Sequence, residues 1–207
     1  MTVRFVVTEH PAALTTRLES HYEQTRRTLE RSSGVPVLTA LYTDVDDLNG
    51  ASAVVLSGSF APWADHAPGA LGRFGDVVLA YDGPVLGICA GMQLQATFAG
   101  GTLRHSPGGL ETGFSPVDVV ENNDLLRGLP SRIDVYQHHG DEIEELPEDF
   151  RVFARSAACA IEAIADPARR WWGTQFHPEE FDAAHPAGER ILRNFFELAD
   201  VRSYGSS

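Results

Sequence analysis

The chain has 207 residues, of which 43% are hydrophobic and 22% are charged, and it carries a formal net charge of −13 at pH 7. Such a composition fits a globular protein with a full core, and the acidic charge disfavours binding to the phosphates of nucleic acids. All 16 basic residues are arginine, which excludes both a lysine Schiff base and the lysine of a phosphate-binding P-loop.

In the first half of the chain, short apolar strands alternate with helical patterns. We predict strands at residues 3–8, 35–42, 53–56 and 85–88. We predict helices at residues 11–31, opened by Pro11, at 68–81 and at 92–98, and a loop with a helical turn at 44–50. Continuous apolar strands between helices indicate a parallel sheet that is buried on both faces.

After residue 101 the pattern changes to strands with few helices between them. We predict strands at residues 116–120, 132–136, 151–156, 160–165 and 171–176. A helix at residues 187–201 closes the chain, and residues 203–207 are expected to fray. The sequence therefore predicts an α/β fold, with a central, mostly parallel sheet flanked by helices and a mixed or antiparallel extension.

The cysteine count and the N-terminal pattern indicate a cytoplasmic protein. Two cysteines, Cys89 and Cys159, are too few for a disulfide framework. The first residues are typical of a strand rather than of a signal peptide, and no apolar run approaches the ~20 residues of a membrane span. No linker or repeat divides the chain, so we expect one domain over residues 1–207.

Cys89 follows a predicted strand in the segment Gly87-Ile88-Cys89-Ala90-Gly91. A Gly-x-Cys-x-Gly turn between a strand and a helix is typical of a nucleophile elbow, because the flanking glycines allow a tight turn. The N-terminus of the following helix would favour the thiolate. Most free cysteines are small core residues, so the motif indicates a nucleophile only together with a base.

A base and its orienting carboxylate lie near the C-terminus. The strand at 171–176 would present His177 at its end, where Pro178 stops the strand, and Glu179 is close enough to contact His177. A thiol nucleophile needs an imidazole to accept its proton, and the imidazole needs a carboxylate to hold its tautomer. A lone His-Pro-Glu is more often a surface turn, but with Cys89 the three residues form a complete candidate triad.

Together the two motifs resemble those of the class I glutamine amidotransferases, the triad glutaminases. The resemblance covers the chain from about residue 53 onward and is strongest to the glutaminase part of GMP synthetase. Besides the motifs, it is carried by Gly113-Phe114, His139-Gly140-Asp141, residues 146–150, residues 154–156 with Cys159, and residues 188–195. It implies a flavodoxin-like glutaminase fold without a cofactor, and a structural role for Cys159.

The resemblance implies that Cys89 attacks the side-chain amide of glutamine, that His177 shuttles protons and that Glu179 orients His177. A γ-glutamyl thioester would form, ammonia would leave and water would release glutamate. The implied oxyanion donors are the backbone N–H groups of Gly58, Ser59 and Ala90. The implied substrate-binding residues are Gln93, His138, Gly140 and Asp141.

Two segments depart from the family's pattern. Ser59 stands where the family usually has a second glycine, and serine adopts some glycine conformations only with strain. We therefore expect an altered oxyanion hole, or one that forms only with a partner bound. Residues 8–11 and a long charged helix replace a short glycine-bearing turn, and His10 is expected to be an ordinary loop residue.

No metal site is predicted. His138 and His139 are adjacent on a predicted strand, so they would point to opposite faces, and no third ligand accompanies them at useful spacing.

The leading interpretation is a glutaminase subunit that supplies ammonia to a partner synthase, because the sequence contains no ATP-binding motif. The partner would be an ATP-dependent synthase, either GMP synthetase-like or from a specialised amidation pathway. One alternative is a stand-alone γ-glutamyl hydrolase or peptidase with the same triad. Another is a non-catalytic regulatory subunit, which the intact triad disfavours and Ser59 weakly favours.

Overall fold

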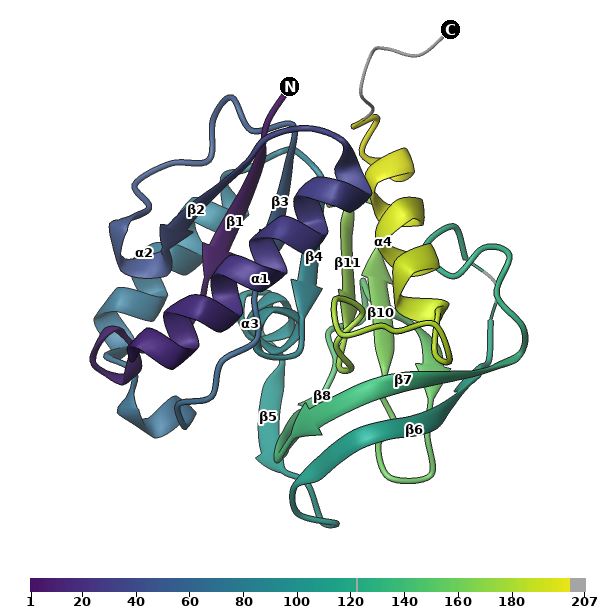
Figure 1. Cartoon of the computed structure of the whole chain (residues 1–207). Coiled ribbons are helices and arrows are strands. Elements are labelled where there is room, and N and C mark those ends of the chain that lie inside the picture. The colour runs from purple at the N-terminus through teal and green to yellow at the C-terminus, as the bar shows by residue number, and fades with distance from the viewer. Residues whose placement is uncertain (122, 202–207) are drawn as a thin grey trace, which may run out of the picture.

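Nine strands form one mixed sheet (Figure 1). The computed structural model describes residues 1–121 and 123–201, so the predicted fraying of residues 203–207 lies outside the described part. The strand order is β2-β1-β3-β4-β11-β10-β9-β6-β7, and neighbours are parallel from β2 to β11 and antiparallel from β11 to β7. The predicted α/β class with an antiparallel extension is confirmed.

The parallel half of the sheet has the flavodoxin-like strand order. Its strands are β2 (Val37–Leu41), β1 (Val3–Val7), β3 (Ala53–Leu56), β4 (Val85–Ile88) and β11 (Trp171–Thr174). Every residue of β3, β4 and β11 is buried, because layers of chain cover both faces of the sheet there. This burial explains why β3 and β4 contain no polar side chain and why β11 contains only one, Thr174.

The antiparallel half is built around a long hairpin. Its strands are β10 (Ala163–Asp166), β9 (Arg151–Arg155), β6 (Glu111–Val119) and β7 (Arg132–His139). β6 and β7 pair from Glu111 opposite His139 to Asp118 opposite Arg132, so both strands are longer than predicted. The missed end of β7, residues 137–139, is entirely polar although Gln137 and His139 are buried, so no apolar alternation marks it in the sequence.

Two further strands were not predicted. β5 (Thr102–His105) and β8 (Asp141–Glu145) pair antiparallel in a separate small sheet. Both are short and largely polar, so no apolar alternation marks them in the sequence. β8 follows β7 directly after Gly140, and it carries Asp141 toward the helix that begins after Cys89.

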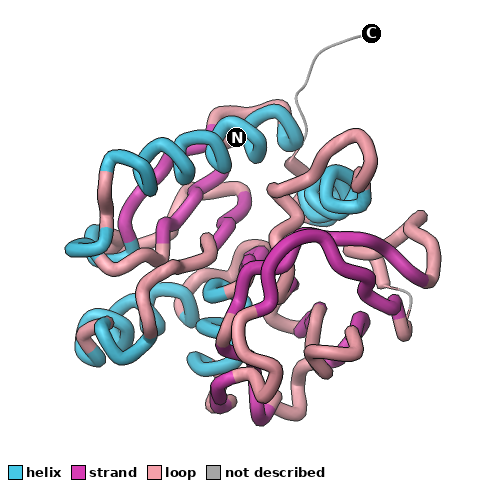
Figure 2. Tube along the Cα trace, turned by 60° about the horizontal axis from the view of Figure 1, so that its bottom comes forward, coloured by secondary structure: helices cyan, strands magenta, loops and turns pink. Residues whose placement is uncertain are grey.

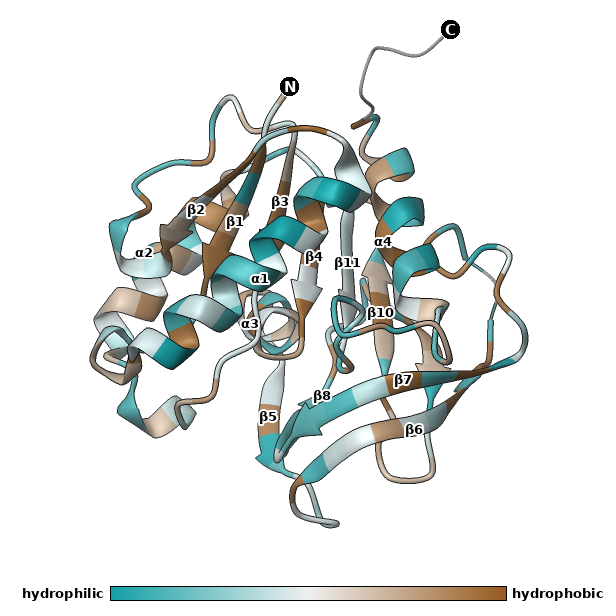
Figure 3. Ribbon diagram, viewed as in Figure 1, coloured by the Kyte–Doolittle hydropathy of each residue, from teal (hydrophilic) through white to brown (hydrophobic). Residues whose placement is uncertain are grey.

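Helices cover both faces of the parallel half (Figures 1 and 2). α1 (Thr16–Ser33) and α4 (Ala187–Leu198) pack together over one face, whereas α2 (Pro68–Leu79) and α3 (Ala90–Phe98) cover the other. Each pair buries its own apolar cluster against the sheet. Hydrophilic residues of α1 and α4 are turned outward, away from the apolar strands (Figure 3).

The first helix begins later than predicted. Pro11 opens only a short 3-10 turn, Pro11–Ala13, and α1 starts after Thr15. The Thr15 hydroxyl accepts a hydrogen bond from Leu18 N at 3.4 Å and caps the helix, so the cap rather than the proline sets the boundary. Smaller differences are that α3 starts at Ala90, β10 starts at Ala163 and α4 ends at Leu198.

Four loops meet at the edge of the sheet where the parallel strands end. They follow β1, β3, β4 and β11 and carry Glu9, Ser59, Cys89 and His177, respectively. Ligands bind at this edge in open parallel sheets, so the fold brings the candidate residues to the expected place. None of the helices in the described residues combines the length and apolar character needed to cross a bilayer.

Candidate active site

Cys89 sits on a strained turn between β4 and α3. Its φ of 51° and ψ of −107° lie outside the regions that non-glycine residues prefer. Cys89 N donates to the Thr174 carbonyl at 2.7 Å. A Cβ at Gly87 would lie 2.5 Å from a backbone nitrogen of α3, and one at Gly91 would lie 2.5 Å from the Leu56 carbonyl oxygen. Both glycines are therefore required for the elbow geometry.

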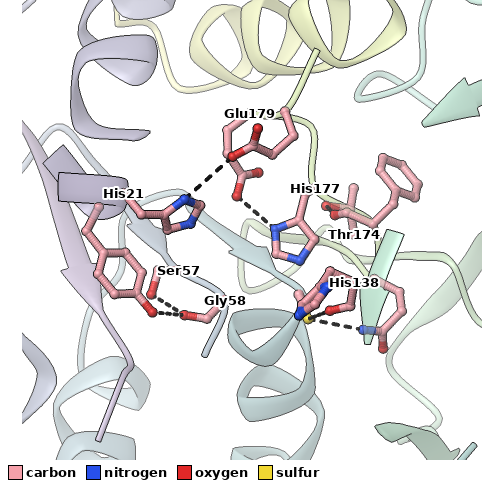
Figure 4. Close-up of polar contacts among 12 residues, drawn as sticks. His21, Ser57, Gly58, His138, Thr174, His177 and Glu179 are labelled. Atoms are coloured by element: carbon pink, nitrogen blue, oxygen red, sulfur yellow. Dashed lines mark hydrogen bonds and ion pairs between the residues drawn. The ribbon is translucent and has the colours of Figure 1, made fainter. Parts of the chain in front are cut away.

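His177 and Glu179 form a buried hydrogen-bonded pair in the loop after β11, which ends at Thr174, two residues earlier than predicted. His177 Nδ1 lies 2.9 Å from Glu179 Oε1, and the two side chains are 9% and 4% exposed (Figure 4). His177 N donates to the Tyr136 carbonyl on β7 at 2.8 Å. On the other side, a Cβ at Gly58 would lie 2.9 Å from His177 Cε1 and 3.6 Å from Cys89 Cβ. The three candidate triad residues thus converge around Gly58.

The electrostatics favour a protonated His177 beside Cys89. Burial by itself lowers the pKa of His177, but the Glu179 carboxylate and the Cys89 sulfur raise that pKa well above its usual value. His177 Nε2 has no hydrogen-bond partner among the described residues, so it is available to exchange a proton. An imidazolium–thiolate pair requires this polarity.

The Cys89 sulfur contacts two polar groups. Sγ contacts the His138 carbonyl oxygen at 3.7 Å and Gln175 Nε2 at 3.5 Å. Within the described part of the chain, the N–H groups of Ser59 and Ala90 donate to no other group. Ser59 is not among the residues with positive φ, so the serine stands here without the strain of a left-handed backbone. The altered or partner-dependent oxyanion hole stays a prediction.

A cavity of about 220 Å³ opens in front of Cys89. Its lining includes Ser59, Ala90 and all four implied substrate-binding residues, Gln93, His138, Gly140 and Asp141. A larger cavity of about 450 Å³ lies between β7 and the start of α4, but none of the candidate catalytic residues lines it. The nucleophile and its base therefore identify the smaller cavity as the candidate site.

The Gln93 side chain is already engaged within the protein. Its Nε2 donates to the Asp141 carbonyl at 2.8 Å and to Gln175 Oε1 at 3.1 Å, and its Oε1 accepts from Trp63 Nε1 at 2.8 Å. A ligand that used this amide would have to replace one of these bonds. In this structure, Gln93 holds the cavity wall together by tying β8 to the loop after β3.

Comparison with known proteins places this arrangement in a family. The model of the glutamine amidotransferase class-I family matches residues 19–199. The chain belongs to this family. A glutamine-hydrolyzing GMP synthase subunit from Thermoplasma acidophilum is 37% identical over 158 residues, which cover 75% of this chain and 76% of the relative. The resemblance seen in the two motifs is thereby confirmed.

Two further relatives define the extent of the match. A solved structure of a GMP synthase subunit from Thermoplasma acidophilum has a TM-score of 0.79 at 31% identity, covering 96% of this chain and 94% of that one. A GMP synthase (glutamine-hydrolyzing) from Syntrophomonas wolfei is 40% identical over 153 residues, which cover 72% of this chain. The match spans only 28% of that relative's own length.

Sequence reasoning missed three residues that shape this amidotransferase site: Glu9, Trp63 and Gln175. Gln175 had a local signal, because it stands two residues before His177 and side chains two apart in an extended segment point the same way. Glu9 lay in the segment that departs from the family pattern, but nothing near it shows what it contacts. No pattern in the sequence around Trp63 indicates that it lines the cavity.

A second group of titratable residues lies on the antiparallel half of the amidotransferase fold. Glu111, His139 and Glu162 each bring one ligand atom within 4.8 Å of the others, and His139 Nε2 is 3.6 Å from Glu111 Oε2. His138 is less buried than His139 and packs on Phe60, so the two histidines do face opposite ways. The sequence offered no third ligand because Glu111 lies at the start of β6 and Glu162 lies in the bend before β10, both far from His139 along the chain. Carboxylate and imidazole groups of this kind could hold a divalent cation.

A proton on Glu162 would balance this cluster without a cation. The net pKa of Glu162 is raised to about 7. Burial is the largest cause, the charges of Glu111 and Glu142 also raise the pKa, and hydrogen bonds from Gln137 and Ser156 lower it. Because the folded pKa lies above the ordinary value of 4.5, the folded state holds the extra proton between these pH values. Stability should therefore fall as the pH rises from 4.5 through about 7.

We expect Glu162→Gln to raise the free energy of unfolding at pH 8 by on the order of 2–3 kcal/mol, because it removes a buried charge that the wild type must carry there. The difference should shrink toward pH 5, where Glu162 is neutral. Urea unfolding at pH 5, 6.5 and 8 in the presence of a chelator measures it. A variant that is less stable than wild type at pH 8 would contradict the proposed proton on Glu162.

Proposed function

We propose that the chain hydrolyses the side-chain amide of L-glutamine through a thioester on Cys89 and passes the ammonia to a partner synthase. The observation that carries this proposal is the convergence of Cys89, His177 and Glu179 beside a cavity in a class I amidotransferase. Ser59 and Ala90 line the same cavity, and their N–H groups donate to no other group in the described part of the chain, which supports the proposal further.

In the first half of the reaction, the Cys89 thiolate attacks the amide carbon, a C–S bond forms and the carbonyl electrons move to oxygen. Ser59 N–H and Ala90 N–H donate to this oxyanion, and each such donor contributes roughly 3–4 kcal/mol to the transition state where it has been measured. His177 Nε2 gives its proton to the amide nitrogen and the C–N bond breaks. Ammonia leaves, and the γ-glutamyl thioester remains.

In the second half, neutral His177 accepts a proton from water, whose oxygen attacks the thioester carbon. The C–S bond breaks, glutamate leaves and the thiolate–imidazolium pair is restored. Glu179 acts through His177: its Oε1 accepts a hydrogen bond from Nδ1 at 2.9 Å, which keeps Nε2 as the group that exchanges protons with Cys89.

The partner that we propose is an ATP-dependent synthase of the GMP synthetase kind, with a specialised amidating enzyme as the alternative acceptor. The three relatives described above are named as GMP synthases, and the two from Thermoplasma acidophilum are named as a subunit, which supports a synthase on another chain. We also propose that residues 1–207 act as one amidotransferase domain in the cytoplasm. One sheet takes strands from both halves of the chain, and both cysteines are free thiols.

Release of glutamate from glutamine by the purified chain, alone and with a candidate synthase and its acceptor and ATP, tests the proposal. We expect release to be faster when the synthase turns over, with one glutamate formed per amidated product. Release from γ-glutamyl peptides but not from glutamine would identify a stand-alone hydrolase instead. No release under any condition would favour a non-catalytic subunit.

A further inference from the structure

The two segments that depart from the family's pattern contact each other in the structure. Glu9 follows β1, and the loop of residues 57–61 follows β3, which is the parallel neighbour of β1. Both segments therefore leave the sheet at the same edge. Glu9 is fully buried there, and donors from the loop surround its carboxylate.

The Glu9 carboxylate accepts five hydrogen bonds. Oε1 accepts from His10 N at 2.9 Å, Ala61 N at 3.0 Å and Ser59 Oγ at 3.1 Å, and Oε2 accepts from Phe60 N at 2.8 Å and Tyr22 Oη at 3.0 Å. Burial by itself raises the pKa of Glu9, but the surrounding backbone N–H groups bring that pKa below its usual value. The carboxylate is therefore ionised at neutral pH, and both of its oxygens accept hydrogen bonds.

The same environment fixes the peptide group between Gly58 and Ser59. The Gly58 carbonyl oxygen lies 2.6 Å from Ser57 Oγ, 3.3 Å from Tyr22 Oη and 3.3 Å from Thr8 Oγ1. In a trans peptide the carbonyl and the N–H point in opposite directions, and the described chain contains no cis peptide. Holding the Gly58 oxygen toward Tyr22 therefore turns the Ser59 N–H the other way, toward the cavity that Ser59 lines with Cys89.

We propose that Glu9 is a positioning residue that holds residues 59–61 so that the Ser59 N–H faces the oxyanion formed at Cys89. The inference rests on the proposed glutaminase function. The N–H groups of Phe60 and Ala61 are taken up by Glu9, which leaves Ser59 as the loop's donor to the cavity. Serine fits at this position because the loop held by Glu9 has no positive φ there.

The isosteric change Glu9→Gln tests the requirement for a carboxylate. A carboxylate offers two acceptor oxygens, whereas an amide offers one and adds an NH₂ donor. Either orientation of the amide sets its NH₂ against the N–H of Phe60 or of Ala61, so the loop must shift. We expect kcat for glutamine hydrolysis to fall about 100-fold with KM nearly unchanged, because the oxyanion exists only after attack.

Asp166→Asn is the matched control. The Asp166 carboxylate is also buried and accepts from Ala168 N at 3.0 Å and Arg169 N at 3.2 Å. It lies at the end of β10 opposite Trp171, where the parallel strands begin, and so at the far edge from Cys89. This variant should lose stability but keep the wild-type kcat.

Alkylation of Cys89 by iodoacetamide separates positioning from a general defect. In this reaction a C–S bond forms as the C–I bond breaks, and no oxyanion develops. The alkylation rate should therefore be the same in Glu9→Gln and in wild type. Glu9→Gln with a wild-type kcat, or with hydrolysis and alkylation slowed equally, would overturn the positioning role.

Amide hydrogen exchange tests the inference without any turnover. We expect the amides of Phe60 and Ala61 to exchange slowly in wild type and at least about tenfold faster in Glu9→Gln, because the variant opposes one of these N–H groups. Equal exchange in the two proteins would overturn the inference. A wild-type chain that hydrolyses no glutamine even with a synthase would contradict the proposed function, whereas the exchange difference would still support Glu9 as the residue that sets the loop.

Discussion

Replacing Cys89 with alanine is expected to lower glutamine hydrolysis at least about 10⁴-fold while the protein stays folded, since loss of a triad nucleophile costs up to about 10⁶ in kcat. The sulfur is the atom that forms the thioester, and Cys159, the other cysteine, does not line the cavity. Alanine occupies the same backbone position at φ 51° with a similar strain, so folding should be little affected. Glutamate release in the presence of the synthase measures the loss.

Cys159→Ala is the control for this variant. Cys159 is the other free cysteine; it is 1% exposed, and its Sγ donates to the Ile161 carbonyl at 3.4 Å. Burial raises the pKa of the Cys159 thiol, which makes it a poor nucleophile. Cys159→Ala should hydrolyse glutamine within about twofold of wild type, as expected for a residue outside the site. Activity that survives in Cys89→Ala but disappears in Cys159→Ala would show that the nucleophile is assigned wrongly.

The second large effect is expected for Glu179→Gln, which should lower kcat by about 10²–10⁴-fold, as loss of the orienting carboxylate does in comparable triads. A neutral amide accepts the hydrogen bond from His177 Nδ1–H more weakly than a carboxylate does. The tautomer of His177 that carries its hydrogen on Nδ1 and presents Nε2 to Cys89 is therefore less populated. The Glu179 charge also raises the pKa of His177, so its removal lowers that pKa. The basic limb of the pH profile of kcat/KM, where His177 loses its proton, should therefore move to lower pH.

Glu180→Gln is the neighbouring control for the pH profile. Glu180 lies 3.8 Å from His21 and makes no bond to His177 Nδ1, so its neutralisation should leave kcat near the wild-type value. The profile is measured as kcat/KM for glutamine between pH 5 and 10. A basic limb that stays in place in Glu179→Gln, or that moves equally in Glu180→Gln, would argue against the assigned orienter.

The positions of Cys89 and His177 could be predicted from the sequence because local rules fix both. Buried parallel strands are largely apolar runs, and the loop after each run lies at the ligand-binding edge. Cys89 follows β4 directly, and His177 lies three residues after β11. The glycines at 87 and 91 have a steric reason that the sequence pattern conveys, since a Cβ at either position would overlap the backbone. Gly140 and Asp141 were placed at the cavity by family resemblance rather than by physics.

The features that the sequence did not reveal depend on contacts between distant residues. β5 and β8 are polar strands that exist because they pair with each other, about 40 residues apart. Glu9 contacts Phe60 and Ala61, which are 51 and 52 residues away, and no local pattern encodes that partnership. The serine at 59 was judged alone, as a strained substitute for glycine, although in the structure Glu9 accepts a bond from it.

The most direct measurement is the mass of the Cys89 peptide after the chain has turned over glutamine with its synthase and been quenched in acid. The proposed mechanism predicts one γ-glutamyl group on Cys89 in wild type, a group that disappears on mild alkaline hydrolysis and is absent in Cys89→Ala. Steady release of glutamate from glutamine with no γ-glutamyl group on Cys89, or with the group on another residue, would contradict it.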